Sequence, residues 1–95
     1  MFVVLLRFAA GNARASDLLA GHTEWIKRGF DEGVFLLTGS LRPNLGGAIV
    51  AHQVSLADLR ARVSEDPFVA HGVVTAEILE IAPSRADPRL SFLLA

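Results

Sequence analysis

The sequence contains no cysteine, and its nine basic residues include only one lysine, Lys27. The lack of cysteine excludes disulfides, thiolate nucleophiles and cysteine-based metal sites. The basic residues are nearly balanced by ten acidic ones, and the arginines are scattered along the chain. A nucleic-acid-binding surface needs a concentrated basic footprint, so we exclude that function.

A long hydrophobic run is also missing. A membrane-spanning helix needs roughly 18 or more consecutive apolar residues, and no run in this chain approaches that length. Residues 1–8 are apolar, but they lack the leading positive charge of a signal peptide, and Arg7 interrupts them. These residues predict a buried strand, and we expect a cytoplasmic protein without a membrane partner.

The chain is instead rich in apolar residues: 52% of its 95 residues are hydrophobic, and the mean hydropathy is +0.43. This length predicts one domain, over residues 1–82, followed by a tail, residues 83–95, that packs on the domain or on a partner subunit. A domain of this size buries only about 60–65% of its unfolded surface. The surplus apolar surface predicts a homodimer.

Hydrophobic periodicity and turn residues predict a βαββαβ order. The expected strands are residues 2–8, 34–38, 48–53 and 73–81, the expected helices are 16–32 and 55–64, and the expected loops are 9–15, with the turn-formers Gly11 and Asn12, and 39–46. Two βαβ halves joined by a hairpin make a ferredoxin-like α+β fold, a four-stranded antiparallel sheet with two helices on one face. A second subunit would cover the other face and give a dimeric α+β barrel.

Capping residues mark the ends of the expected helices. Ser16 is expected to be the N-cap of the first helix, and Gly33 is expected to follow its last turn. Ser55, with Asp58 three residues later, has the pattern of a capping box. Asp66, directly before a proline, is the expected N-cap of a further short helix.

His22 and Asp66 are the candidate catalytic residues. Leu18, His22 and Trp25 are spaced by three and four, which places the histidine on the apolar face of the first helix. It is either a core histidine that bonds a backbone carbonyl or an acid–base group. Asp66 is either only a cap or a carboxylate that also faces the imidazole and fixes its tautomer. Ser40, Trp25 and Phe68 are candidate substrate contacts, although Ser40 is more typical of a turn.

No motif predicts a metal or a cofactor. His52 and His71 complete the set of three histidines, but no pair has the spacing of a metal site. Gly46 and Gly47 lie between two expected strands and lack the continuation of a phosphate-binding loop. None of the serines has the surroundings of a nucleophile elbow.

Three segments together resemble the YCII-related family: His22-Thr23-Glu24-Trp25, then Gly33-Val34-Phe35-Leu36-Leu37-Thr38-Gly39-Ser40, then Glu65-Asp66-Pro67-Phe68 with Gly72-Val73. The resemblance covers roughly residues 1–82 and lies in the order and spacing of these segments. It implies a ferredoxin-like fold that forms homodimers, related at the level of fold to muconolactone isomerases and small monooxygenases. It also implies an active-site pair at His22 and Asp66, with proton-transfer chemistry of the lyase type on small molecules. The short loop after Ser40 and the histidine at position 71 depart from the family pattern.

Three functions therefore stay open at this point. The first is an enzyme that eliminates from, isomerises or dehydrohalogenates a small hydroxylated or aromatic acid through His22 and Asp66. The second is a module that binds a small ligand without turnover, and the third is an interaction protein whose apolar tail makes the contact. A hydrogen bond between His22 and Asp66 in a cleft open to solvent favours the enzyme, whereas a separation above about 6 Å disfavours it.

Overall fold

The computed structural model describes residues 1–10 and 14–94. Its elements follow the predicted order, including the short helix expected after Asp66, with a terminal 3₁₀ turn added: β1 (Phe2–Phe8), α1 (Ala15–Asp31), β2 (Phe35–Leu41), β3 (Gly46–Ala51), α2 (Leu56–Ser64), α3 (Pro67–Ala70), β4 (Val74–Glu80) and η2 (Pro88–Leu94). The turn expected at Gly11 and Asn12 lies outside the described residues. Within the described part of the chain, no helix combines the length and apolarity needed to cross a membrane.

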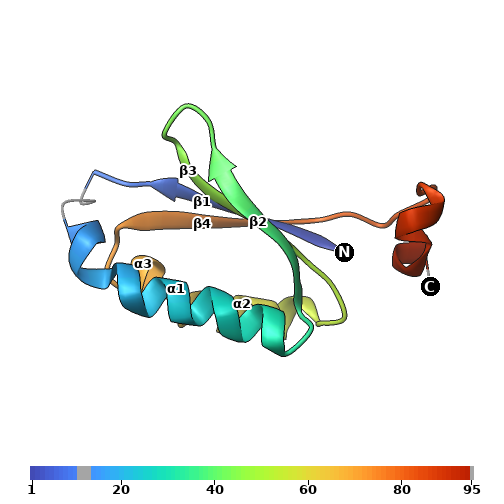
Figure 1. The fold of residues 1–95 in the computed structure, drawn as a ribbon, viewed down its shortest axis with the longest axis horizontal. Helices are drawn as coiled ribbons and strands as arrows, with labels where there is room; N and C mark the ends of the chain where they lie inside the picture. The colour runs from blue at the N-terminus through green and yellow to red at the C-terminus, as the bar shows by residue number, and fades with distance from the viewer. Residues whose placement is uncertain (11–13, 95) are drawn as a thin grey trace.

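The four strands form one sheet in the order β2-β3-β1-β4, and each neighbouring pair is antiparallel. The three helices cover one face of this sheet, and none of the described elements covers the other (Figure 1). This arrangement confirms the predicted ferredoxin-like α+β class.

The core lies between the sheet and the helices. Phe2, Val4 and Leu6 of the central strand β1 are buried against the helices, because alternate residues of a strand share a face. From the helical side, Trp25 of α1 and Leu59 of α2 are almost completely buried. The indole Nε1–H of Trp25 donates to the backbone carbonyl of Arg62 at 3.0 Å and so links α1 to α2.

The β2–β3 hairpin differs from the prediction. β2 continues to Leu41 and β3 begins at Gly46, so the loop expected at residues 39–46 shrinks to residues 42–45. Gly46 has φ +134, and a Cβ there would lie 1.9 Å from the backbone oxygen of Leu6. The glycine therefore permits close approach of two strands and does not mark a turn. Ser40 pairs with Gly47 and thus lies in a strand.

The start of α1 is a second difference. The helix begins at Ala15 with Arg14 as its N-cap and no side-chain capping bond, so the prediction of Ser16 as N-cap is wrong. Alanine is a strong helix former, and it carries the helix back past the expected cap. The other boundary signals are confirmed: Ser55 and Asp66 cap α2 and α3, and Gly33 has φ +74 directly after the end of α1.

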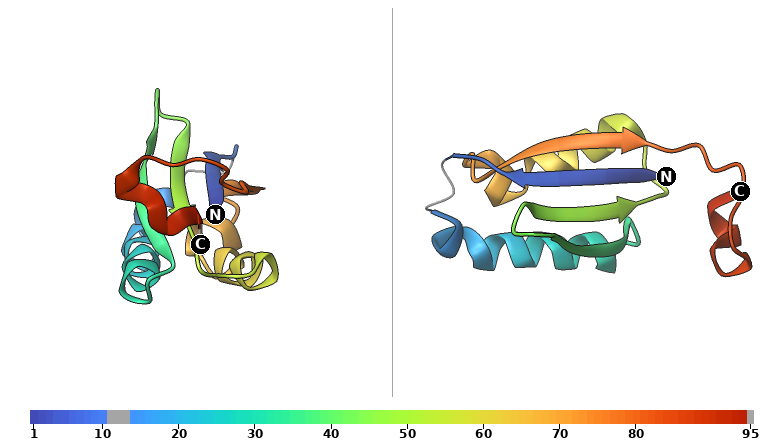
Figure 2. Two further views of the ribbon diagram at one scale, coloured as in Figure 1. Left: turned by 90° about the vertical axis from the view of Figure 1, so that its right-hand side faces the viewer. Right: turned by 90° about the horizontal axis from the view of Figure 1, so that it is seen from above.

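The C-terminal tail leaves the sheet after Ile81, whose N–H donates to the Met1 carbonyl at 2.8 Å. Its 3₁₀ turn, η2, lies beyond the end of the sheet (Figures 1 and 2). The ring of Phe92 meets His52 edge-on at 5.7 Å. Leu90, Phe92 and Leu94 remain 46–48% exposed in the single chain. Docking of this tail on a partner subunit stays a prediction.

The contact between α1 and β2 leads to a stability prediction. A Cβ at Gly29 would lie 2.0 Å from the ring of Phe35, which is buried. Overpacking costs about 1–3 kcal/mol, and at this distance we expect the cost to exceed the gain of about 1 kcal/mol in helix propensity. Gly29→Ala should therefore lower the thermal midpoint followed by circular dichroism.

Gly21→Ala in the same helix is the matched control. The atom nearest to a Cβ at Gly21 would be the Cγ of Pro67 at 3.1 Å, and the proline ring can move this atom by changing its pucker. The propensity gain is the same, and the steric cost is small. Equal midpoints for the two variants would contradict the packing argument.

Candidate active site

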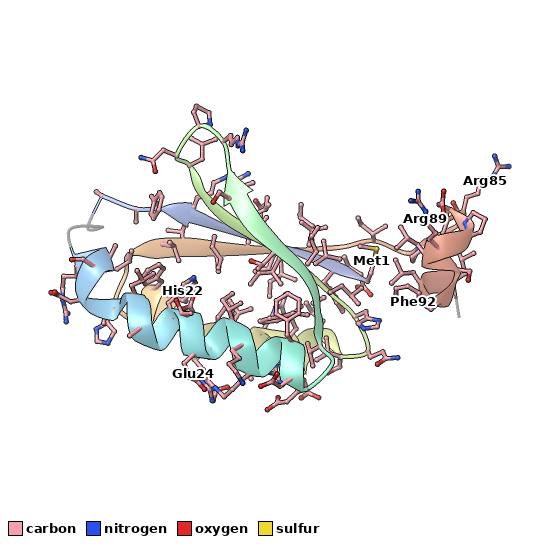
Figure 3. The ribbon with its side chains drawn as sticks, in the orientation of Figure 1. Met1, His22, Glu24, Arg85, Arg89 and Phe92 are labelled. Atoms are coloured by element: carbon pink, nitrogen blue, oxygen red, sulfur yellow. The ribbon has the colours of Figure 1, made fainter. Side chains whose placement is uncertain are left out.

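His22 lies near the middle of α1, on the side of the helix that faces the sheet. Figure 3 shows it in the layer between α1 and the strands, whereas Glu24, two residues later, points away from the domain. This difference follows from the period of the helix, since residues two apart point to nearly opposite sides. The side chain of His22 is 19% exposed, so one part of the ring reaches solvent.

Asp66 approaches the same imidazole from the start of α3. Its side chain is completely buried, and its Oδ1 lies 2.7 Å from Nδ1 of His22. The same Oδ1 accepts the backbone N–H of Phe68 at 3.0 Å, which is the N-cap bond of α3. One oxygen therefore serves both roles, and the two interpretations of Asp66 left open by the sequence do not exclude each other.

The contact with Asp66 sets the tautomer of a neutral His22 ring. A carboxylate only accepts hydrogen bonds, so the proton of the contact lies on Nδ1. The lone pair of the ring then lies on Nε2, for which the described residues supply no hydrogen-bond partner. The second carboxylate oxygen, Oδ2 of Asp66, is buried and also has no partner among the described atoms.

Two aromatic rings hold the imidazole in place. Phe68 stacks on it at 4.0 Å between ring centroids with an interplanar angle of 6°. Trp25 lies farther away, at 6.0 Å and 29°. Because Phe68 also donates its backbone N–H to Asp66, one residue orients both members of the pair. Phe68, which was expected only as a substrate contact, thus also positions His22 and Asp66, a role that the sequence did not indicate.

A cleft of about 340 Å³ opens beside His22, between α1 and the inner face of the sheet. The helices and the sheet contribute these lining residues: Leu19, His22, Thr23, Ile26 and Phe68 from the helices; Leu6, Phe8, Thr38, Gly39, Ser40, Gly46, Gly47, Ala48, Ile49 and Val74 from the sheet. The structure thus brings His22, Phe68 and Ser40 together at one cleft, with Asp66 behind the imidazole. Trp25 does not line it and is 2% exposed in the core.

Thr38 is a cleft residue that the sequence pattern did not indicate. It lies two residues before Ser40, on the same face of β2, and pairs with the buried Ile49. The period-two alternation would have found it had β2 been predicted to continue past residue 38. Its hydroxyl donates to the carbonyl of Ala48 at 3.1 Å.

The other two histidines lie elsewhere. Nδ1 of His71 is 3.5 Å from the guanidinium of Arg14, near the start of α1, and His52 meets the tail at Phe92. Neither lines the cleft. In residues 1–10 and 14–94, no group of three or more histidine, cysteine or acidic side chains is arranged to hold a metal ion.

The fold and the cleft define a small ferredoxin-like domain with a histidine–aspartate pair beside a cavity. The family model of the YCII-related domain matches residues 1–82, and the chain belongs to this family. Among solved structures, it is similar to 5-chloro-2-hydroxyhydroquinone dehydrochlorinase from Burkholderia phenoliruptrix, in a complex with 2,5-dihydroxybenzoquinone. The TM-score is 0.70 at 14% identity, over 84% of this chain and 91% of that one, a likeness of fold. No curated protein matches the sequence.

Proposed function

We propose that this protein is a small-molecule enzyme in which His22, oriented by Asp66, transfers a proton to or from a ligand in the cleft. The observation that carries the proposal is the 2.7 Å contact between Nδ1 of His22 and the buried Oδ1 of Asp66, on a ring that also lines a cavity. A core histidine satisfied by a carbonyl would need neither the carboxylate nor the cavity. The distance is also well inside the limit of about 6 Å above which the enzyme hypothesis loses support.

The proposed chemistry follows from Nε2 of His22, the ring nitrogen that has no hydrogen-bond partner among the described residues. Nε2 of His22 takes a proton from an O–H or C–H bond of the ligand, and the electron pair of that bond stays on the ligand. In an elimination, the pair forms a new double bond, and a leaving group on a neighbouring carbon departs with its own bonding pair. In an isomerisation, His22 returns the proton to a different carbon. The carboxylate of Asp66 stabilises the imidazolium that forms in between.

The structural neighbour supports this reaction class. Its name describes a dehydrochlorinase, and the removal of hydrogen chloride is an elimination that needs a base and a route for the leaving halide. The base in this chain would be His22. Neither His22 nor Asp66 is placed as a covalent nucleophile, so the proposal involves no acyl-enzyme.

A ligand screen followed by an activity assay tests the proposal. Thermal-shift measurements with a panel of small hydroxylated rings, halogenated rings and aromatic acids identify binders, because a ligand stabilises the native state by mass action. Absorbance spectroscopy then follows the conversion of each binder. Conversion that is lost in His22→Ala supports the enzyme, whereas binding with no conversion by the wild-type chain supports a ligand-binding module, which the cleft alone would also favour.

We further propose that the active unit is a homodimer formed through the uncovered face of the sheet. A row of apolar side chains crosses that face from β2 to β4: Leu37 pairs with Val50, Val50 with Val3, and Val3 with Leu79. Leu37 is 63% exposed and Leu79 is 45% exposed in the single chain. Burial of such a row against a second copy is favourable in proportion to its apolar area.

The dimer gives a prediction for the mass in solution. Light scattering at micromolar concentration should give twice the mass of the chain for the wild type. Leu79→Glu places a charge in the proposed interface, and we expect it to shift the mass to that of the monomer. Leu45→Glu is the matched control, since Leu45 is 52% exposed on the hairpin loop and lies outside the apolar row. A monomeric wild type would refute the dimer.

A further inference from the structure

The least expected feature of the cleft is its lack of charged side chains. Among the described residues that line it, none has a carboxylate, ammonium or guanidinium group. The residues outside the described ranges are Gly11, Asn12, Ala13 and Ala95, which have no charged side chain either. The polar side chains are those of His22, Thr23, Thr38 and Ser40, set among aliphatic and aromatic side chains. If the imidazole becomes protonated, Asp66 at 2.7 Å balances its charge.

Two hydroxyls stand on the sheet side of this cleft. Thr38 and Ser40 share the inner face of β2, where they pair with Ile49 and Gly47 respectively. His22 lines the same cavity from α1, so a ligand placed there would have the imidazole on one side and the two hydroxyls on the other. Because Gly47 has no side chain, nothing from β3 covers the hydroxyl of Ser40 on that face.

The two hydroxyls differ in what they can offer a ligand. Thr38 donates its hydroxyl proton to the carbonyl of Ala48 at 3.1 Å, so its oxygen can only accept a hydrogen bond from a ligand in the cleft. Ser40 has no hydrogen bond to any described residue and can donate or accept. The wall therefore suits one ligand hydroxyl that donates to Thr38 and accepts from Ser40.

We propose that Thr38 and Ser40 form an oxygen-binding wall, and that the cleft takes a small uncharged ring with hydroxyl groups on opposite sides, as in a dihydroxybenzene. The inference rests on the proposed function, because it assigns the ligand of the same cleft. A carboxylate or phosphate would lose hydration in an apolar cavity that offers it no cation, and this cost is large. The volume of about 340 Å³ is near the lower end of small-molecule sites, about 300–1,000 Å³, and suits a single ring.

This ligand class also fits the chemistry of the site. When Nε2 of His22 takes the proton of one ligand hydroxyl, the electron pair of that O–H bond stays on the ligand, on that oxygen and on the ring carbons ortho and para to it. The hydroxyl of Ser40 can donate to the oxygen on the far side of the ring and so orient the ring with its other hydroxyl at the base. Ser40 thus binds the oxygen at the end of the ring remote from the base, and the ligand needs oxygens at both ends. This narrows the earlier expectation of hydroxylated or aromatic acids to neutral hydroxylated rings.

The test compares hydroquinone with 4-hydroxybenzoate, which replaces one hydroxyl by a carboxylate. Calorimetric titration of the wild-type chain, under argon, should give at least about tenfold tighter binding of hydroquinone. Ser40→Ala and Thr38→Val should each weaken hydroquinone binding about two- to tenfold, the value of one hydrogen bond. Thr38→Ser should restore it. Thr75→Val, on the opposite face of the sheet, is the control and should bind as the wild type does.

The outcomes separate this inference from the proposed function. Equal or tighter binding of 4-hydroxybenzoate, unchanged affinity in both wall variants, or binding of neither probe would overturn the oxygen-binding wall. Selective hydroquinone binding that depends on Ser40 and Thr38, in a protein that converts no ligand, would support the wall and count against catalysis by His22. Conversion of aromatic acids that depends on His22 would support catalysis by His22 and count against the oxygen-binding wall.

Discussion

His22→Ala should leave the domain folded and lower kcat/KM for any ligand that the cleft converts by about 10²–10⁴-fold, the usual contribution of a positioned general base. The loss should appear mainly in kcat, because Thr38, Ser40 and the apolar walls still hold the ligand. The deletion removes the stacking on Phe68 and the hydrogen bond to the buried Asp66, so we also expect some loss of stability, which the remaining bond from the N–H of Phe68 to Oδ1 limits. Steady-state kinetics and circular dichroism measure the two effects side by side.

The other histidines supply the controls. His71→Ala and His52→Ala remove an imidazole at positions that do not line the cleft, and both should retain the activity of the wild type. A drop of similar size in either control would mean that activity does not depend on the pair at the cleft. Full activity in His22→Ala would remove the base from the mechanism altogether.

Periodicity predicted most of the fold because the core obeys it. Alternation in β1 separates Phe2, Val4 and Leu6 from the residues on the outer face, and the spacing of three and four in α1 places Trp25 and His22 toward the sheet. Those patterns reflect burial, which is a property of each residue and its near neighbours in sequence. They were sufficient to place the candidate base.

Periodicity did not predict the bounds of the β2–β3 hairpin, because the glycine at the start of β3 is required by a contact between residues distant in sequence. Gly46 is required where β3 passes the backbone of Leu6 in β1, and this contact joins residues 40 positions apart. Local turn rules assign such a glycine to a loop. The misplaced loop hid Thr38 as a cleft residue and made Ser40 resemble a turn serine, so the oxygen-binding wall became visible only with the strand register.

Trp25 shows the converse case. The apolar stripe of α1 contains both Trp25 and His22, and the sequence gives no reason to separate a core residue from a cleft residue on that stripe. The structure separates them because the indole reaches α2 through the carbonyl of Arg62, whereas the imidazole turns toward α3 and Asp66. Side-chain partners distant in sequence decide which member of a buried stripe faces a cavity.

Asp66→Asn should lower kcat by about 10²–10⁴-fold while the domain stays folded. The amide oxygen can still accept from the N–H of Phe68 and from Nδ1–H of His22, so the cap and the orientation of the ring survive. The negative charge that stabilises the imidazolium is lost. Since Oδ2 already lacks a partner, the buried NH₂ replaces one unpaired atom by another, and the free energy of unfolding should fall by less than about 2 kcal/mol.

Ser55→Ala isolates the structural part of this effect. Ser55 caps α2 by accepting the N–H of Asp58 at 3.0 Å, it does not line the cleft, and its removal should cost about 1 kcal/mol of stability with no loss of activity. Denaturant unfolding and kinetics on the two variants then distinguish a cap from a catalytic partner. If Asp66→Asn lost no more activity than Ser55→Ala, Asp66 would be a cap alone and His22 would act without it. A large loss in Asp66→Asn only, at similar stability, assigns the buried carboxylate to the chemistry.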